Sequence, residues 1–462
     1  MQFLRRLTLL LAAAATCFTT ITAQQVAPFK DGERAVFLGN SITDGGYYHS
    51  YIWPYYMTRF PEMPITVVNA GIGGDTALEM TRRLDNDVFS HDPTVLMVTF
   101  GMNDSGYFEH NGENGRQFAR EKYEESIRNF RQMEQRLKAL PDTRIVMVGT
   151  SPFDEGTAIP ANHINGKAAT IERIVATQMQ TATDNGWEQI DFCAPMTEIN
   201  RARQTEDSTF TLCGSDRIHP DNDGHMVMAY LFLKAQGFTG SKVADVAINA
   251  GKPSVIREEN CSVTDLRKNG NRITFNYLAN ALPYPTDTIA RGWGMSRPQA
   301  RALDIVPFTE EMNREMLTVT GLKGDYKLTI DGEEIGVWSA HSLAKGINLA
   351  EITLTPQYQQ ALTVMFLNER RCEIERQFRE YAWIQNNFFE PKGLLNANNR
   401  HSIEVMDQYV DSDPWLKLRR DRYAQMMHEP VRKAMEDEMN MLIDRIYTVN
   451  KPVVRHFELR KI

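Results

Sequence analysis

The first half of the sequence predicts an α/β fold: a three-layer α/β/α domain with a flavodoxin-like parallel sheet. Between Ala35 and Gly237, apolar runs of strand length alternate with segments of helical periodicity. This alternation is typical of parallel strands joined by crossover helices, which cover both faces of the sheet. Short polar and glycine-rich blocks also follow the first three apolar runs, where an open parallel sheet presents its binding edge.

Five apolar runs are expected to form the sheet, and the segments between and after them its helices. The predicted strands are Ala35–Leu38, Ile65–Val68, Val95–Phe100, Ile145–Gly149 and Gln189–Phe192. The predicted helices are Tyr51–Arg59, Thr76–Asp87, Glu121–Leu140, Ala168–Asn185 and His225–Ala235. A strand order of 2-1-3-4-5 brings the loops after the first three strands to one edge.

The pattern changes after a boundary at Ser241–Pro253, so we expect one domain over residues 28–240 and a C-terminal accessory region over 254–462. The accessory region starts with short strand-like runs and contains Asp331-Gly332, a strong hairpin signal. A helical hairpin is expected to follow. Its helices are predicted at Gln357–Asn386, after Thr355-Pro356, and at Trp415 to about Tyr447, after Ser412-Asp413-Pro414.

Residues 1–23 have the pattern of a secretory signal peptide. Arg5 and Arg6 precede an apolar run that is too short to span a bilayer, and a small residue, Ala23, ends the segment. We therefore expect cleavage near Ala23 and a secreted or periplasmic protein. Cys17 raises a lipoprotein anchor as the less favoured alternative, because Ala14-Ala15-Thr16 before it is a poor lipobox.

The composition is that of an ordinary globular protein, with 42% hydrophobic and 24% charged residues. A net charge of −8 gives no reason to expect nucleic acid as a partner, and we expect no membrane span in the mature chain. Sparse cysteines exclude a disulfide scaffold. A Cys193–Cys213 bridge and free buried thiols both remain open, and Cys261 and Cys372 are likewise unassigned.

Four blocks carry groups suited to nucleophilic chemistry: GNSIT at 39–43, GIGGDT at 71–76, GMND at 101–104 and DRIHP at 216–220. Ser41 offers a hydroxyl nucleophile. His219 offers its base, and Asp216, three residues earlier, can hold Nδ1 of the imidazole and leave Nε2 to take the serine proton. This spacing predicts a catalytic triad.

The other two blocks supply hydrogen-bond donors for a developing oxyanion. Gly74 has no side chain, so its backbone N–H can approach a substrate closely, and Asn103 offers a side-chain amide. With the N–H of Ser41 they form a three-donor oxyanion hole. The reaction of such a set, ester hydrolysis through an acyl-enzyme, requires neither a metal nor a cofactor.

These blocks resemble those of the SGNH hydrolases, the GDSL-type esterases and lipases, in which they contribute Ser, Gly, Asn and His. Carried over by position, the resemblance implies Ser41 as nucleophile, Gly74 and Asn103 as oxyanion donors, and Asp216 with His219 as the acid and base pair. Asn40 stands where the GDSL motif has an aspartate. This substitution changes a supporting residue, which affects only how the serine loop is held. Long secreted bacterial relatives include polysaccharide deacetylases, so the resemblance implies an O-acetylated carbohydrate as substrate.

Two alternatives to carbohydrate deacetylation remain. One is a lipase or lysophospholipase, which the polar and aromatic surroundings of the site disfavour. The other is a carbohydrate-binding protein whose hydrolase domain has lost its activity, which the intact set of four blocks disfavours.

Two further patterns near the blocks have both a structural and a functional interpretation. Aromatic residues between Tyr47 and Tyr56 are expected to be largely core, but Tyr47 and Tyr48, with Tyr107 and Phe108, are candidates for a sugar-stacking rim. The group of Asp221, Asp223 and His225 suggests a metal site only weakly, because neither HExxH nor a complete calcium loop is present. An acidic helix start is the favoured interpretation of that group.

Overall fold

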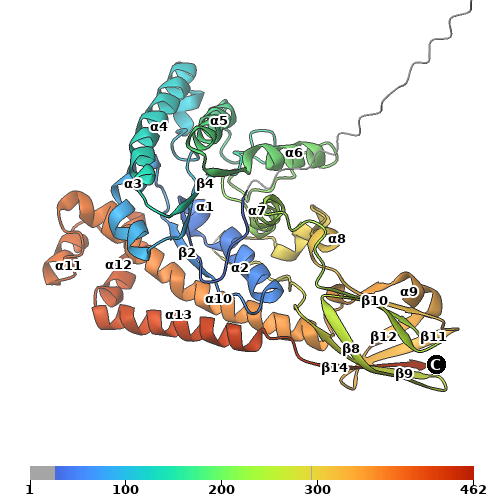
Figure 1. Cartoon of the computed structure of the whole chain (residues 1–462). Coiled ribbons are helices and arrows are strands. Elements are labelled where there is room, and N and C mark those ends of the chain that lie inside the picture. The colour runs from blue at the N-terminus through green and yellow to red at the C-terminus, as the bar shows by residue number, and fades with distance from the viewer. Residues whose placement is uncertain (1–25, 293) are drawn as a thin grey trace, which may run out of the picture.

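The computed structural model describes residues 26–292 and 294–462. The predicted signal peptide, residues 1–23, lies outside these ranges and stays a prediction. Within them, no helix combines the length and the apolar character that a bilayer crossing requires. Figure 1 shows a helix-covered sheet joined to long C-terminal helices and to a separate β-rich end that holds the C-terminus.

The first sheet confirms the predicted fold and strand order. Its five strands are all parallel, in the order β2-β1-β3-β4-β5. Alternate side chains of β1 to β4 enter two different apolar cores, one on each face, which explains the nearly continuous apolar runs in the sequence. The strands are β1 (Arg34–Gly39), β2 (Thr66–Gly71), β3 (Val95–Val98), β4 (Arg144–Gly149) and β5 (Glu188–Asp191).

Helices cover both faces of this sheet. One core contains residues of α2 (Tyr47–Arg59), α6 (Cys193–Gln204) and α7 (Asn222–Ala235). The opposite core contains residues of α3 (Ala77–Arg82) and α4 (Gly115–Lys138), and α5 (Lys167–Asn185) contributes to both. The sequence did not predict α6, which begins two residues after β5. Its single buried stripe at Cys193, Met196 and Asn200 is too short a periodic signal.

Two further sheets form the β-rich end and share one apolar core. Their strand orders are β13-β10-β6-β7 and β12-β11-β14-β9-β8. The predicted hairpin at Asp331-Gly332 is confirmed, since both residues have positive φ and join β11 to β12. The expected boundary segment holds β6. The strands are β6 (Ala244–Asn249), β7 (Ser254–Glu259), β8 (Cys261–Asn269), β9 (Arg272–Ala279), β10 (Glu315–Thr320), β11 (Asp325–Ile330), β12 (Glu333–Ser339), β13 (Ile347–Asn348) and β14 (Arg455–Lys461).

The C-terminal helices differ from the predicted hairpin in two respects: the second helix is broken, and the unpredicted helix α11 (Arg400–Asp407) lies before it. The first, α10 (Pro356–Trp383), begins as predicted and continues into a π-helical turn over Ile384–Phe389. The second is broken into α12 (Pro414–Met426) and α13 (Glu429–Val449). Pro430 explains the break, because proline lacks the N–H that would continue α12 and fits the first turn of a new helix. The shorter helices are α1 (Ser41–Asp44), α8 (Phe308–Met312), α9 (Ala340–Lys345) and α11 (Arg400–Asp407).

The long helix α10 is packed against the first domain through buried polar contacts. Ser50 of α2 lies 2.7 Å from the thiol of Cys372, and Asn368 donates to the Ser50 carbonyl. In Figure 1, α10 runs beneath the first domain beside α2 and β2. The accessory region is therefore attached to the side of the first domain that contains α2 and β2.

Buried charges connect α10 to the sheet. Arg83 pairs with Asp75 and with Asp87 at 2.6 Å, and Arg379 of α10 pairs with Asp87 at 2.7 Å. Arg83 also donates to the carbonyls of Gly39 and Ala70, the ends of β1 and β2. These groups compensate one another only while all are present, because a buried charge without its partner is strongly destabilising.

Replacing Arg83 with alanine tests this dependence. Arg83→Ala leaves Asp75 buried without its cation, so we expect the free energy of unfolding to fall by about 3–5 kcal/mol. The measurement is urea unfolding of the whole chain. The control is Arg34→Ala, which removes an exposed pair with Asp92 and is expected to cost less than about 1 kcal/mol. Equal effects of the two substitutions would contradict the role of the buried cluster.

Candidate active site

Ser41 stands at the carboxyl end of β1, as the first residue of the short helix α1. Asn40 caps this helix, since its side-chain oxygen accepts the N–H of Ile42 at 3.1 Å. Asparagine thus keeps the capping role that an aspartate can fill, and the departure from the GDSL pattern leaves the serine turn intact.

The side chains of Ser41, His219 and Asp216 form a continuous hydrogen-bonded chain. His219 Nε2 lies 2.8 Å from Ser41 Oγ, and its Nδ1 lies 2.5 Å from Asp216 Oδ2. The two loops are 178 residues apart in sequence. The structure therefore brings together the three predicted residues in the order that a serine nucleophile, its base and an orienting carboxylate require.

A tight turn holds Asp216 and His219 at this spacing. Oδ1 of Asp216 accepts the backbone N–H groups of Ile218 and His219, both at 2.9 Å. Arg217 between them has a φ of +64°, in the left-handed region that non-glycine residues rarely occupy. Its buried guanidinium secures the turn by donating to backbone carbonyls of Asp154, Glu155, Ile159 and Ala161.

The environment keeps Asp216 ionised. Burial by itself raises the pKa of this carboxyl, but the hydrogen bonds it accepts from His219 and Ile218 outweigh burial and lower the pKa. An ionised Asp216 accepts the Nδ1–H of His219, which leaves Nε2 unprotonated and facing Ser41.

The predicted donors lie on the two neighbouring loops. Gly74 has a φ of +92°, which favours glycine, while the space beside its Cα is open. The Asn103 amide is held from both ends: its Nδ2 donates to the Asp75 carbonyl at 2.9 Å, and Tyr107 donates to its Oδ1 at 2.5 Å. One Nδ2 hydrogen is left for another acceptor.

Two residues that the sequence analysis missed support the Asn103 loop from below. Asp104 accepts the N–H groups of Gly101 and Ala77, which ties the loop to the start of α3. The buried Lys167 donates to the carbonyls of Met102 and Gly106, each at 2.6 Å. Burial lowers the pKa of Lys167 to about 7. Asp104 belongs to the GMND block and could have been found from that motif. Lys167 lies 63 residues after Asp104, and no sequence motif around it indicates a role in the site.

The candidate sugar-stacking rim is partly wrong. Tyr47 and Tyr48 are only 2% and 1% exposed, and Tyr48 stacks on His225 inside the core. Tyr48 packs against Phe37 of β1 and His225 of α7, and Tyr47 packs against His225 and lies under Arg376 of α10, so both rings are buried. Tyr107 is partly buried and supports Asn103, whereas Phe108 is 59% exposed.

The acidic group after His219 has a structural role. Asp221 accepts the N–H groups of Ser296 and Arg297, and the guanidinium of Arg297 pairs with Asp223 at 2.6 Å. These contacts tie the start of α7 to the accessory region. The four cysteines of the described ranges, Cys193, Cys213, Cys261 and Cys372, are free thiols.

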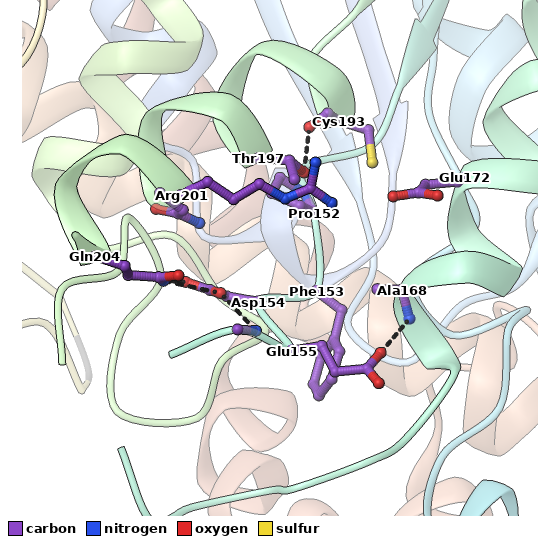
Figure 2. A pocket seen from close by; sticks show the side chains of 12 residues that line it. Pro152, Phe153, Asp154, Glu155, Ala168, Glu172, Cys193, Thr197, Arg201 and Gln204 are labelled. Carbon is purple, nitrogen blue, oxygen red and sulfur yellow. Dashed lines mark hydrogen bonds between the residues drawn. The ribbon is translucent and has the colours of Figure 1, made fainter. Parts of the chain in front are cut away.

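A hollow with charged walls lies next to the turn that holds Asp216 and His219. It is lined by the segment after β4, by α5 and by α6 (Figure 2). Its lining includes Asp154, which accepts from Gln204, and Glu155, which accepts the N–H of Ala168. The backbone carbonyls of Asp154 and Glu155 also receive Arg217. Ser41 is not among the lining residues, so the hollow is not the reaction site. Its walls instead support the turn of Asp216 and His219 through Arg217.

Comparisons with known proteins agree with this geometry. Residues 37–227 match the GDSL-like lipase/acylhydrolase family, and residues 362–451 match the diltiazem deacetylase C-terminal helical domain. A solved structure of a gut microbial diltiazem-metabolizing enzyme is 62% identical and covers 95% of this chain and 100% of its own, with a TM-score of 0.94. The chain belongs to the GDSL-like (SGNH) family.

This SGNH protein is therefore an ester hydrolase. A curated relative, an acetylxylan esterase of Geobacillus stearothermophilus, is 25% identical over 228 residues, which cover 45% of this chain and 95% of the relative. That match covers a length similar to that of the SGNH domain alone, whereas the gut microbial enzyme also matches the accessory region.

The lowered pKa of Asp216 predicts a pH-dependent contribution to stability. Because its folded pKa lies below its unfolded value of about 3.9, Asp216 contributes stability above that pH and loses it as the pH falls through the folded pKa. We expect Asp216→Asn to destabilise the protein at pH 7 and to have a smaller effect at pH 3. Urea unfolding of both proteins at the two pH values measures this, and a difference independent of pH would contradict it.

Proposed function

We propose that this esterase removes acetyl groups from its substrates, with Ser41 as nucleophile, His219 as general base and Asp216 as the residue that orients the base. The observation that carries the proposal is the 2.8 Å hydrogen bond between Ser41 Oγ and His219 Nε2, continued through Nδ1 to Asp216. A serine hydroxyl is a weak nucleophile until such a base takes its proton.

The reaction proceeds in two halves. Ser41 Oγ attacks the ester carbonyl while its proton passes to His219 Nε2, and His219 then gives that proton to the leaving alcohol. Water enters, loses a proton to His219 and attacks the acetyl-enzyme, which releases acetate and restores Ser41. Throughout, Asp216 remains ionised and stabilises the imidazolium.

Three donors are proposed to bind the oxyanion: the N–H of Ser41, the N–H of Gly74 and the free Nδ2 hydrogen of Asn103. Neither of the two backbone N–H groups has a hydrogen-bond acceptor within residues 26–292 and 294–462. Donors that are fixed in place but unpaired are suited to a charge that appears only in the transition state.

The names of the relatives support acetyl as the acyl group. One is an acetylxylan esterase, and the helical region matches a domain named for a diltiazem deacetylase. We propose an O-acetylated carbohydrate as the natural substrate and secretion through the predicted signal peptide. An acetylated small molecule such as diltiazem is the second candidate, which the extended match to the diltiazem-metabolizing enzyme favours.

Acyl specificity and nucleophile can be tested together. We expect nitrophenyl acetate to give a higher kcat/KM than nitrophenyl octanoate, and Ser41→Ala to lower kcat by about 10⁶-fold. The chain-length profile is measured first and the variant second. A preference for octanoate would favour a lipase, and an active Ser41→Ala protein would refute the nucleophile. Acetate release from acetylated xylan and from diltiazem then separates the two acetyl substrates.

The Asn103 amide is expected to act on the transition state. Asn103→Ala should lower kcat with nitrophenyl acetate by about 10²–10³-fold and leave KM nearly unchanged, because it removes one oxyanion donor. Steady-state kinetics measure both parameters. Asn271→Ala, in an exposed turn before β9, is the matched control with wild-type kinetics. A change in KM alone would show that Asn103 binds the ground state instead.

A further inference from the structure

One stripe of α10 follows the loop between β2 and α3, which carries Gly74. Four residues spaced by four along the helix and its π-turn bond to four residues spaced by two, of which the first two lie at the end of β2 and the last two in the loop. The pairs are Glu375 with the Asn69 N–H at 3.1 Å, Arg379 with the Gly71 carbonyl at 2.9 Å, Trp383 with the Gly73 carbonyl at 3.2 Å, and Asn387 with the Asp75 carboxylate at 3.4 Å.

The two spacings match in length. Four residues of α-helix rise about 6 Å, and two residues of extended chain span about 6.6 Å. The match applies to Asn69 and Gly71 in the extended strand β2. Beyond them the chain turns, with the Asp75 N–H bonded to the Ile72 carbonyl at 3.3 Å, and Trp383 and Asn387 bond to residues of that turn. Because three of the four contacts go to backbone groups, α10 fixes the path of the loop rather than its side chains.

The Trp383 contact acts directly on the donor at Gly74. The carbonyl of Gly73 and the N–H of Gly74 belong to one planar trans peptide group, so they point in opposite directions. When the indole N–H of Trp383 holds the Gly73 oxygen on the α10 side, the Gly74 N–H must face the other side of the loop. At a φ of +92° the glycine backbone is intrinsically free to rotate, so this orientation needs an external restraint.

Other groups hold Trp383 and the preceding peptide. Asp44 of α1, three residues after Ser41, accepts the N–H of Gly73 at 3.0 Å. The guanidinium of Arg419 on α12 lies 4.6 Å from the Trp383 ring centre and covers the indole. The loop is thus restrained between the serine helix on one side and two accessory helices on the other.

We propose that Trp383 is a positioning residue of the esterase, which orients the Gly74 N–H toward the oxyanion, and that the C-terminal helical region is thereby part of the catalytic apparatus. This inference rests on the proposed function of Ser41 and Gly74. It gives the accessory region a role in the rate of the chemical step that does not depend on the identity of the leaving alcohol.

The test is Trp383→Phe in the whole chain, which keeps an aromatic ring beside Arg419 and removes the indole N–H. We expect kcat with nitrophenyl acetate to fall by about tenfold, a part of the 10²–10³-fold that one oxyanion donor supplies, with KM unchanged. Phosphonylation of the enzyme by a fluorophosphonate should slow by a similar factor, since its oxygen occupies the oxyanion position. Trp415→Phe, an exposed tryptophan of α12 with no hydrogen bond to the loop, is the control and should retain wild-type kinetics.

A second substitution keeps the test decisive if the phenylalanine variant folds poorly. Benzothienylalanine at position 383 has the shape of tryptophan with sulfur in place of the N–H, and the same loss of kcat is expected. Wild-type kcat in either folded variant, or a loss confined to KM, would overturn the proposal. If instead the wild type hydrolyses no ester, or Ser41→Ala stays active, it is the proposed function that fails.

Discussion

The arrangement of the site depends on a buried pair of arginines around one carboxylate. Arg83 of the first domain and Arg379 of α10 both bind Asp87, and both also donate to carbonyls at the ends of β1 and β2. Burial alone raises the pKa of Asp87, but the two arginines outweigh burial and lower it, so the carboxyl stays ionised. Since none of these charges is tolerated without its partners, the cluster fixes α10 against the strands that precede the Ser41 and Gly74 loops.

The two halves of the site are held by different means. On the base side, Arg217 and Arg297 clamp the DRIHP turn and the start of α7 through backbone carbonyls and carboxylates. On the donor side, α10 holds the loop of Gly74 one peptide group at a time. Both clamps draw on the accessory region, which contributes Arg297 on one side and Trp383 on the other. The similarity to a solved diltiazem-metabolizing enzyme therefore includes both the SGNH blocks and the accessory residues that hold them.

The sequence predicted the parts of this molecule that are encoded locally. Ser41, Gly74 and Asn103 stand in short blocks that follow β1, β2 and β3, Asp216 and His219 share one block with a three-residue spacing, and the parallel sheet follows from alternation alone. Trp383, Lys167 and Arg379 could not be found in this way, because each acts on residues 60 or more positions distant. The burial of Tyr47 and Tyr48 depends on distant residues, His225 of α7 for both rings and Arg376 of α10 for Tyr47. The strand β14 was not predicted for a similar reason. It pairs with β9 and β11, which lie more than 120 residues earlier, so its pairing is not encoded locally.

A crystal structure of the whole protein after reaction with a fluorophosphonate tests the central claim most directly. We expect a single covalent bond to Ser41 Oγ. We also expect a phosphoryl oxygen about 2.7–3.1 Å from the Gly74 N–H nitrogen and from Asn103 Nδ2, with the Trp383 indole still bound to the Gly73 carbonyl. An adduct on another residue, or a phosphoryl oxygen directed away from Gly74 and Asn103, would contradict the claim.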